Sequence, residues 1–513
     1  MNTDKNHQES RKIEIPDSLI EQAKKNESNP QKDTLNKRAL TSGMFFVFAQ
    51  LFARGLTLVA TPFYTRLLST SQYGVVRNYE SWLMAAYTVM SLCLWRSEDV
   101  AKQDYKDHYY EYTSSVHSLS YLSILFFTAL MLIFKTPIQN FLEWDDVMFY
   151  FCPLYVLTYT SMLYLQRRDK QMLKYKLATA ATLLTIVPGI LLSLILLYYG
   201  KTHGMEESLI RLRVIGYYTP QILGGAIIAL LIWKQGKTFF NKEYWIYGLK
   251  FSVPLIPEAE SVQIMNLSDK FMVQKLVGAA ETGIFALPQT VSFIISILED
   301  SVWNAWIPWL YEKIARDELE DVEKPWVTVM HIFGLMSWVL VALAPEEIAI
   351  LGDKNDYAAS IYLIAPMVTG SLFRFYSYSY SAIQNYHKNT RWVAFGTIST
   401  MLLNVILNYI FIVHINYQAA AYTTMISFIV LLFMQGYLEH RITGMVIVPL
   451  HKTVMIGAFY AIINMATMSL FHLAWYLRWL IILVVCLAAL VILRERLLAV
   501  LHVFTSKKKK SAR

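Results

Sequence analysis

Charge is scarce in this chain. Only 16% of its 513 residues are Asp, Glu, Lys or Arg, whereas 55% are hydrophobic and the mean hydropathy is +0.36. Soluble domains carry about 25% charged residues, so the composition excludes a soluble protein and predicts a polytopic membrane protein. Cysteine is scarcer still. Cys93, Cys152 and Cys486 all fall in apolar segments, which excludes a disulfide framework and leaves no metal-ligand spacing.

Several functional motifs are also missing. The sequence has no glycine-rich phosphate-binding loop and no long polar loop that could form a soluble domain. We therefore expect no cofactor and no direct use of ATP by this chain. A membrane enzyme would need clustered catalytic groups near one face, and no nucleophile–base constellation is present. Residues 1–39 lack the apolar core of a signal peptide, so the first apolar span would direct insertion.

The apolar residues gather in segments long enough to cross a hydrocarbon core of about 30 Å as helices. Lipid offers the backbone no hydrogen-bond partners, so each segment is expected to be helical. The sequence thus predicts an all-α fold with about 14 transmembrane helices. The predicted spans are residues 40–63, 79–95, 115–134, 147–165, 177–199, 213–233, 251–268, 284–306, 326–344, 360–383, 392–413, 417–436, 453–471 and 475–493.

The positive charges alternate between loops. If the N-terminus is cytoplasmic, the inner segments hold 34 of the 46 Lys and Arg residues, the outer loops hold 9, and 3 lie within spans. This bias places both termini in the cytoplasm of a multi-pass plasma (inner) membrane protein. The net charge of +8 follows from the same rule and is no nucleic-acid signature, so we expect no nucleic-acid partner.

A short pattern occurs twice. The stretch Arg66-Leu-Leu-Ser-Thr-Ser-Gln-Tyr-Gly74 aligns with Lys275-Leu-Val-Gly-Ala-Ala-Glu-Thr-Gly283, and about 6 predicted spans separate the copies. Each copy follows one apolar segment and leads into another. The repeat predicts two similar six-helix halves, a common transporter plan with the substrate site between the halves.

This repeat and the loop charges define the predicted organisation. The expected parts are a cytoplasmic, disordered tail (1–39), an N-terminal six-helix lobe (40–233), a cytoplasmic linker (234–250), a C-terminal six-helix lobe (251–436), two additional helices (437–493) and a basic cytoplasmic tail (494–513).

Two of the three in-span cations are arginines that lie well away from the span ends. Arg54 follows Gln50 by one helical turn in the first span, and Arg374 lies in the tenth. Charges are costly in a membrane and usually face a bundle interior or a wet cavity. A guanidinium stays charged and binds phosphate in a bidentate manner, so both arginines are candidates for an anion-binding cavity.

Carboxylates and prolines accompany these arginines in the second half. Glu258, Glu260 and Glu299 are candidates for counter-charges or for binding a coupling cation. Lys270, which follows Glu260 at helical spacing, and Gln50 join the two arginines as candidates for substrate binding in the cavity. Pro254 and Pro257 precede the carboxylates and predict a hinge, although a plain packing kink explains them equally well. Interhelical hydrogen bonding is the alternative role for the polar residues of these spans.

The chain resembles polysaccharide-biosynthesis membrane proteins of the Wzx type. The resemblance covers roughly residues 38–500. It rests on Phe45–Gly74 with Arg66-Leu-Leu and Gln72-Tyr-Gly74, on Pro254-Leu-Ile-Pro257 with Leu267-Ser-Asp269-Lys270-Phe-Met-Val and Gly283-Ile-Phe-Ala, and on Trp303-Asn-Ala-Trp-Ile-Pro308-Trp with Tyr311-Glu-Lys. The family often has Asp-Arg where this chain has Asp269-Lys270, which keeps the charge but loses the planar fork.

The resemblance implies two lobes around a central cavity and a flippase function. The implied substrate is an oligosaccharide unit on an isoprenoid pyrophosphate, with membrane lipids and other polysaccharide assembly proteins as further partners. The last two spans would form a groove for the isoprenoid tail. Three alternatives stay open: a multidrug or cation antiporter of the same fold, a membrane polysaccharide polymerase, and a scaffold without transport.

Overall fold

The structure is a computed structural model that describes residues 51–510 except 54, 317, 319, 353–354 and 445–447. The described residues form helices and no strand. Residues 55–67 are helical, and the first half continues with α3 (Thr70–Met90), η1 (Leu94–Ser97), α4 (Glu98–Asp104), α5 (Tyr109–Ile133), α6 (Lys135–Leu142), α7 (Asp146–Gln171), α8 (Tyr175–Thr202), η2 (Glu206–Ser208), α9 (Leu209–Gly236) and α10 (Lys242–Ser252). The second half comprises η3 (Val253–Leu255), α11 (Ile256–Leu276), α12 (Ala279–Ala315), α13 (Glu320–Ala342), α14 (Ala344–Leu351), η4 (Ala358–Ser360), α15 (Ile361–Tyr386), α16 (Thr390–His414), α17 (Ala419–Thr443), α18 (Leu450–Thr467), η5 (Met468–His472) and α19 (Trp475–Lys510).

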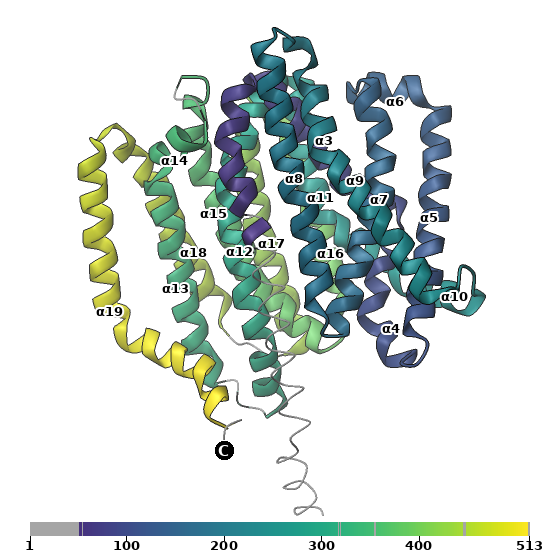
Figure 1. Cartoon of the computed structure of the whole chain (residues 1–513). Helices are drawn as coiled ribbons and strands as arrows, with labels where there is room; N and C mark the ends of the chain where they lie inside the picture. Colours follow the sequence, from purple (N-terminus) through teal and green to yellow (C-terminus); the bar gives the residue numbers. More distant parts are fainter. Residues whose placement is uncertain are drawn as a thin grey trace, which may run out of the picture.

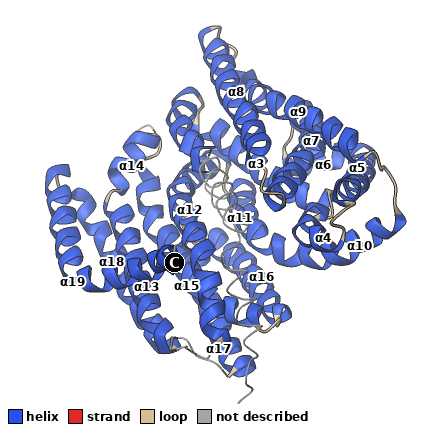
Figure 2. Ribbon diagram, turned by 60° about the horizontal axis from the view of Figure 1, so that its bottom comes forward, coloured by secondary structure: helices blue, strands red, loops and turns tan. Residues whose placement is uncertain are grey.

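The helices form two lobes with α3, α11 and α12 at their junction (Figures 1 and 2). Helices α5 to α9 lie on one side of this junction, and α13 to α17 lie on the other. Helices α18 and α19 stand outside the second lobe, where α18 packs on α13 and α15 and α19 on α13. This arrangement confirms an all-α fold of two lobes with two additional helices.

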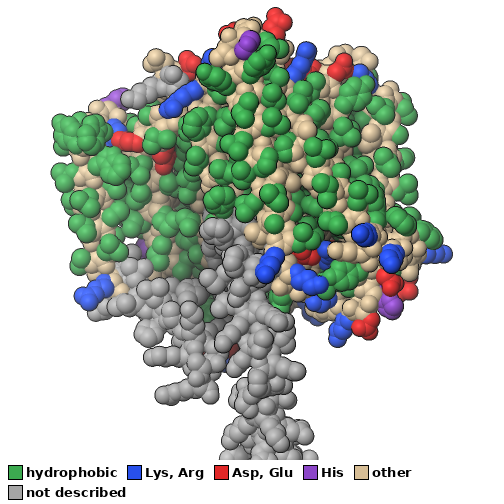
Figure 3. All heavy atoms as spheres, viewed as in Figure 1, with side chains coloured by type: hydrophobic (Ala, Val, Ile, Leu, Met, Phe, Trp, Pro, Cys, Tyr) green, Lys and Arg blue, Asp and Glu red, His purple; other side chains and the backbone are tan. Residues whose placement is uncertain are grey.

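A membrane protein requires an apolar belt, and Figure 3 shows hydrophobic side chains covering the middle of the visible face, with charged side chains toward its two ends. Ten described helices are long and apolar enough to cross a membrane. The predicted count of fourteen is therefore not confirmed. Helices α3 and α11 reach 21 residues each but carry charged residues, which lowers their hydropathy.

Two predicted boundaries were wrong. Helix α3 begins at Thr70, well before the predicted span 79–95, because a capping box starts it. The Ser69 hydroxyl accepts from the Gln72 backbone N–H at 3.2 Å, and the Gln72 side chain accepts from the Ser69 N–H at 3.0 Å. The predicted span 251–268 is not one helix either. The 3₁₀ turn η3, with Pro254 at its start, separates α10 from α11.

The two copies of the sequence repeat meet where α3 crosses α12. A Cβ atom on Gly74 would lie 2.0 Å from the carbonyl oxygen of Ala279, and one on Gly283 would lie 2.1 Å from that of Thr70. Any side chain at either position would therefore push the helices apart, so glycine is needed for this backbone contact. The crossing lies at the end of the bundle that carries α6 and α14, opposite α4 and α10 (Figure 1).

Hydrogen bonds join the lobes at this same end, which we call the crossing end. The Asn78 amide donates to the Gln274 side chain at 2.7 Å, and Gln274 donates to Glu143 at 2.8 Å. Lys275 adds an ion pair to Glu143 at 2.6 Å. The Thr65 hydroxyl donates to the carbonyl of Leu351 at 2.6 Å. The crossing end is thus closed by backbone packing and by a polar network.

We predict that Gly74→Val prevents this closure, because the added side chain meets the backbone of α12. Transport should fall about tenfold or more, with the protein still in the membrane. A cysteine introduced at Ser292, in a background free of the three native cysteines, should become reactive to an impermeant thiol reagent added at the crossing end. Gly248→Ala is the matched control, since its nearest neighbour is a Val116 methyl at 3.1 Å. If Gly74→Val left the reactivity of this cysteine unchanged, closure of the crossing end by the glycine contact would be contradicted.

The opposite end holds a carboxyl group without a cationic hydrogen-bond partner. Glu98 begins α4 and is fully buried. The Thr113 hydroxyl donates to its Oε2 at 3.0 Å, while Oε1 has no partner among the described residues. Burial raises the pKa of Glu98 to about 8. The hydrogen bonds of Tyr109 and Thr113 and the charge of Arg168 lower this pKa only in part, and the charge of Asp99 raises it further.

The sign of this pKa shift predicts a pH dependence. Between pH 4.5 and about 8 the folded state keeps the Glu98 proton that the unfolded state has lost, so the free energy of unfolding should fall as pH rises. Glu98→Gln should flatten this part of the stability–pH profile, measured as the melting temperature in detergent. Glu111→Gln, an exposed neighbour, should leave the slope in place. An equal slope in Glu98→Gln would refute the assignment.

Candidate functional site

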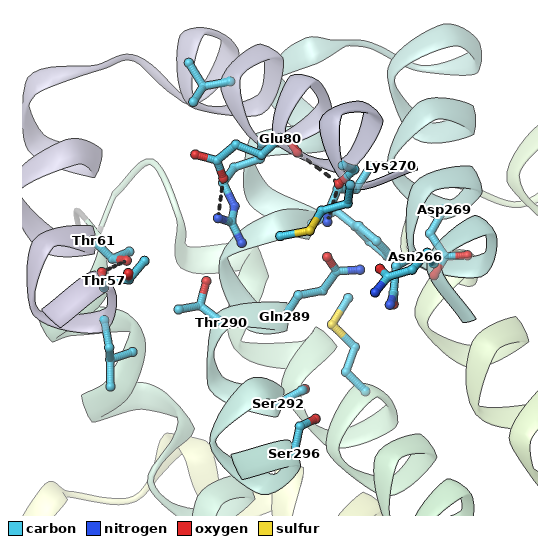
Figure 4. A pocket seen from close by; sticks show the side chains of 18 of the residues that line it. Thr57, Thr61, Glu80, Asn266, Asp269, Lys270, Gln289, Thr290, Ser292 and Ser296 are labelled. Atoms are coloured by element: carbon cyan, nitrogen blue, oxygen red, sulfur yellow. Dashed lines mark hydrogen bonds and ion pairs between the residues drawn. The ribbon is translucent and has the colours of Figure 1, made fainter. Parts of the chain in front are cut away.

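A central cavity of about 620 Å³ lies between the lobes. Its lining comes from both sides: residues 55–68, α3, α7, α8 and α9 from the first lobe, and α11, α12, α15 and α17 from the second. Figure 4 shows the polar side chains that point into it, with Glu80 from α3 facing Asn266 and Lys270 from α11 and Gln289 from α12. The site is therefore shared, and its shape depends on how the lobes sit together.

Two arginines of the first lobe share one carboxylate. The Arg77 Nη1 lies 2.6 Å from one Glu80 oxygen, and the Arg213 Nη2 lies 3.2 Å from the other. Arg77 and Glu80 are one turn apart on α3, which places them on one face. The Arg213 guanidinium lies between the rings of Tyr64 and Tyr217, 4.2 Å from each centroid.

This cluster carries a net positive charge. Glu80 can neutralise only one of the two guanidiniums, and the side chain of Arg213 is only 5% exposed. The Nη1 of Arg213 and the Nε of Arg77 have no hydrogen-bond partner among the described residues. Free guanidinium N–H groups in a low-dielectric site attract anions with oxygen acceptors, above all phosphates.

Lys270 adds a third cation from the second lobe. Its Nζ donates to the Ser81 hydroxyl at 2.9 Å, so it lies next to Glu80 across the lobe junction. The adjacent Asp269 turns to the other side, where it accepts from the Asn408 amide at 2.5 Å and from the Thr424 hydroxyl at 2.9 Å. Lys270 is thus free of a carboxylate hydrogen-bond partner and can contribute to anion binding.

The surroundings of Asp269 are rich in oxygen. Asn408 also donates to the amide oxygen of Asn404 at 3.2 Å and accepts from the Thr423 hydroxyl, and Asp269 is only 1% exposed. Carboxylate, amide and hydroxyl oxygens are ligands that hard cations prefer. Among the described residues no group of three or more His, Cys, Asp or Glu side chains could hold a metal ion.

Two predicted site residues, Arg374 and Glu299, lie together in the same cavity. The Arg374 Nη2 lies 2.8 Å from a Glu299 oxygen and donates to the Ser296 hydroxyl at 2.9 Å. Glu299 is 3% exposed in its side chain, and Arg374 is 13% exposed. This pair is internally neutral, so Arg374 attracts a substrate anion less strongly than the pair formed by Arg77 and Arg213.

Other predicted site residues lie outside the described structure. Gln50 and Arg54 are not described, and neither are the side chains of Pro257, Glu258 and Glu260, whose backbone belongs to α11. Their cavity, coupling and hinge roles stay predictions. Pro254 lies in η3, at a break between two helices, which is a place where a hinge is feasible.

A comparison with protein families shows to which family this chain belongs. Residues 40–313 match the family described as "Polysaccharide biosynthesis protein". The chain belongs to this family. It is a multi-pass membrane protein of this polysaccharide-biosynthesis family. An uncharacterized membrane protein of Haemophilus influenzae is 21% identical over 372 residues, which cover 70% of this chain and 86% of that protein.

Solved structures share the fold of this family member. The lipid II flippase MurJ in an inward closed conformation is 17% identical, with a TM-score of 0.60 over 92% of this chain and 100% of that chain. An inward-facing multidrug resistance MATE family transporter of the MOP superfamily is 13% identical, with a TM-score of 0.53 over 82% of this chain and 99% of that chain. These likenesses show a two-lobed transporter fold.

Sequence reasoning missed Arg77 and Arg213. Arg77 was assigned to an outer loop because the predicted span began too late, at 79. Arg213 was counted with the outer-loop cations because it stands at the first position of the predicted span 213–233. The capping box Ser69–Gln72 is the sequence signal that would have started α3 earlier and placed Arg77 inside it. No comparable signal marks the start of α9, since Ser208 makes no side-chain cap hydrogen bond.

We predict that the ion pair between Arg374 and Glu299 stabilises the folded protein. Glu299→Gln should destabilise the protein by about 2–3 kcal/mol, because it leaves the Arg374 charge uncompensated in a largely buried place. The double variant with Arg374→Gln should recover at least half of that loss, as measured by denaturant unfolding in detergent. Arg316→Gln, which breaks an exposed pair with Glu312, should cost about 0.5 kcal/mol or less. Equal losses in the single and double variants would contradict the coupling.

Proposed function

We propose that this protein is a flippase for isoprenoid-pyrophosphate-linked oligosaccharides and that it moves them from the cytoplasmic to the outer leaflet by alternating access. The pyrophosphate and sugars cannot cross hydrocarbon, whereas the lipid tail need not leave it. A flippase must therefore offer only the headgroup a polar, cationic path. Family membership and the two-lobed fold support this function.

The cavity arginines are the observation that carries the proposal. Arg77 and Arg213 share Glu80 and keep free N–H groups, and Lys270 adds a charge from the other lobe. Three cations next to one carboxylate favour a ligand that carries two or more negative charges, as a pyrophosphate does. The same arrangement disfavours cationic drugs, which speaks against the multidrug antiporter alternative.

Alternating access follows from the closed crossing end. The glycine crossing and the Glu143 network close the cavity at the end that the loop charges predict to be extracellular. A headgroup would enter from the cytoplasmic side and leave after the crossing has opened. An inside-negative membrane potential would favour this export by about 2.3 kcal/mol per charge per 100 mV.

Coupling to a cation is a further part of the proposal. The carboxylates Glu258 and Glu260 keep their predicted role, and Glu299 is held in its ion pair with Arg374. Asp269 has the oxygen-rich surroundings that a cation would need. A test of ion coupling should therefore include Asp269→Asn beside changes at the two glutamates.

We predict that Arg213→Gln lowers flipping about tenfold or more, because the pyrophosphate loses a desolvated bidentate partner. Flipping is measured with the lipid-linked oligosaccharide in proteoliposomes, and protein level by immunoblot. Arg374→Gln should reduce flipping less, since Glu299 already neutralises that arginine. If Arg213→Gln and the wild type flipped the substrate at the same rate, Arg213 would have no role in its translocation.

Deletion of the gene tests the function as a whole. The cell should accumulate complete isoprenoid-linked oligosaccharide on the cytoplasmic side of the membrane. Complete but unpolymerised units in the outer leaflet would indicate an enzyme of assembly instead. Efflux of a cationic dye by cells that carry the protein would favour the antiporter.

A further inference from the structure

The second-lobe wall of the central cavity carries three uncharged amide side chains beside its charged residues. Gln263 and Asn266 lie three residues apart on α11, and Gln289 lies on α12. Figure 4 shows the amide ends of Asn266 and Gln289 pointing toward the same open space. We call Gln263, Asn266 and Gln289 the amide wall.

The amide wall has unused hydrogen-bonding capacity. Among the described residues, none of the three amide groups has a hydrogen-bond partner. By contrast, the threonines Thr57 and Thr61 on the facing side donate to carbonyls of their own helix at 3.0 Å. All three side chains are half-buried and line the cavity, so their amide groups are open to hydrogen bonds from a ligand or from water.

The two walls divide the cavity by chemistry. The first lobe contributes the guanidiniums of Arg77 and Arg213. The second contributes the three amides, each with two donors and one acceptor, beside the neutral Arg374–Glu299 pair. Lys270 lies at the boundary between the two walls and faces Ser81. A headgroup with a pyrophosphate at one end and sugars at the other would match both walls at once.

We infer that the amide wall recognises the sugar part of the substrate, and that the sugar in contact with it is uncharged and rich in hydroxyl or acetamido groups. This inference rests on the flippase function proposed above. A primary amide pairs with neighbouring sugar hydroxyls as donor and acceptor, whereas an acidic sugar would call for a free guanidinium, and Arg374 is engaged with Glu299.

The amide wall thereby sets substrate specificity. A site that hydrogen-bonds a hydroxyl rejects an analogue without that hydroxyl, because its own polar groups are then left unpaired. The arginines bind any isoprenoid pyrophosphate and carry no information about the sugar. Changes at the amide wall should thus alter which oligosaccharide is accepted without altering affinity for the lipid pyrophosphate.

The test compares two probes on the full-length protein in lipid nanodiscs. One probe is undecaprenyl pyrophosphate without sugar. The other is the isoprenoid-linked oligosaccharide extracted from cells that lack the gene. Dissociation constants are measured by native mass spectrometry for the wild type, the double variant Asn266→Leu/Gln289→Leu, and Arg213→Gln. Gln221→Leu is the matched control, since its amide donates to the Tyr217 carbonyl of the same helix at 3.0 Å and does not line the cavity.

The double variant should bind the sugar-free probe within about twofold of the wild type and the oligosaccharide probe about tenfold more weakly or worse. Arg213→Gln should weaken both probes, and Gln221→Leu neither. Retained binding of the sugar-free probe also shows that the double variant is folded. If it binds neither probe, the single variants Asn266→Ala and Gln289→Asn are measured, and each should selectively weaken the oligosaccharide probe.

Equal weakening of both probes in these single variants, or unchanged oligosaccharide binding in the double variant, would overturn the inference about the amide wall. Failure of the wild type to bind either probe would overturn the proposed function itself. The two failures are therefore distinguishable.

Discussion

The need to neutralise charge inside the membrane shapes this protein more than any other interaction. Glu80 balances one of the two guanidiniums that approach it, so the cluster keeps a residual positive charge. The carboxylate also keeps the empty site stable, since two unopposed guanidiniums would repel each other. A phosphate that enters competes with Glu80 for the same N–H groups, so binding and release are set by a balance between two anions.

The internal repeat gives this site its closure. Gly74 and Gly283 occupy equivalent places in the two copies, and each admits the backbone of the other helix. The helices that meet there, α3 and α12, also carry cavity residues such as Glu80 and Gln289. Any movement that parts the crossing must therefore shift the two cavity walls against each other, which couples access to binding geometry.

Several charged residues of the cavity could be predicted from the sequence, but the ion pairs between them could not. Arg374 and Glu299 were both recognised as intramembrane charges, but their spacing along the chain could not reveal that they form an ion pair with each other. Lys270 was predicted to be a cavity residue and does line the cavity. Arg77 and Arg213 were counted only among the outer-loop cations, because charge lowers the hydropathy at the ends of the spans. Hydropathy finds helices that face lipid, and it is weakest for helices that line a polar cavity.

Amino-acid order by itself determined the class of this protein: a helical, multi-pass membrane protein of two similar halves. The length of the apolar segments, the charges of the loops and the sequence repeat are all properties of the linear sequence. The tertiary structure decided which residues form the site, because residues from eight helices and from 55–68 meet in one cavity only after the lobes pack. It also decided that Arg77 and Arg213 share Glu80 and that the amide wall faces the same cavity. The distance between two residues in space cannot be read from their separation along the chain.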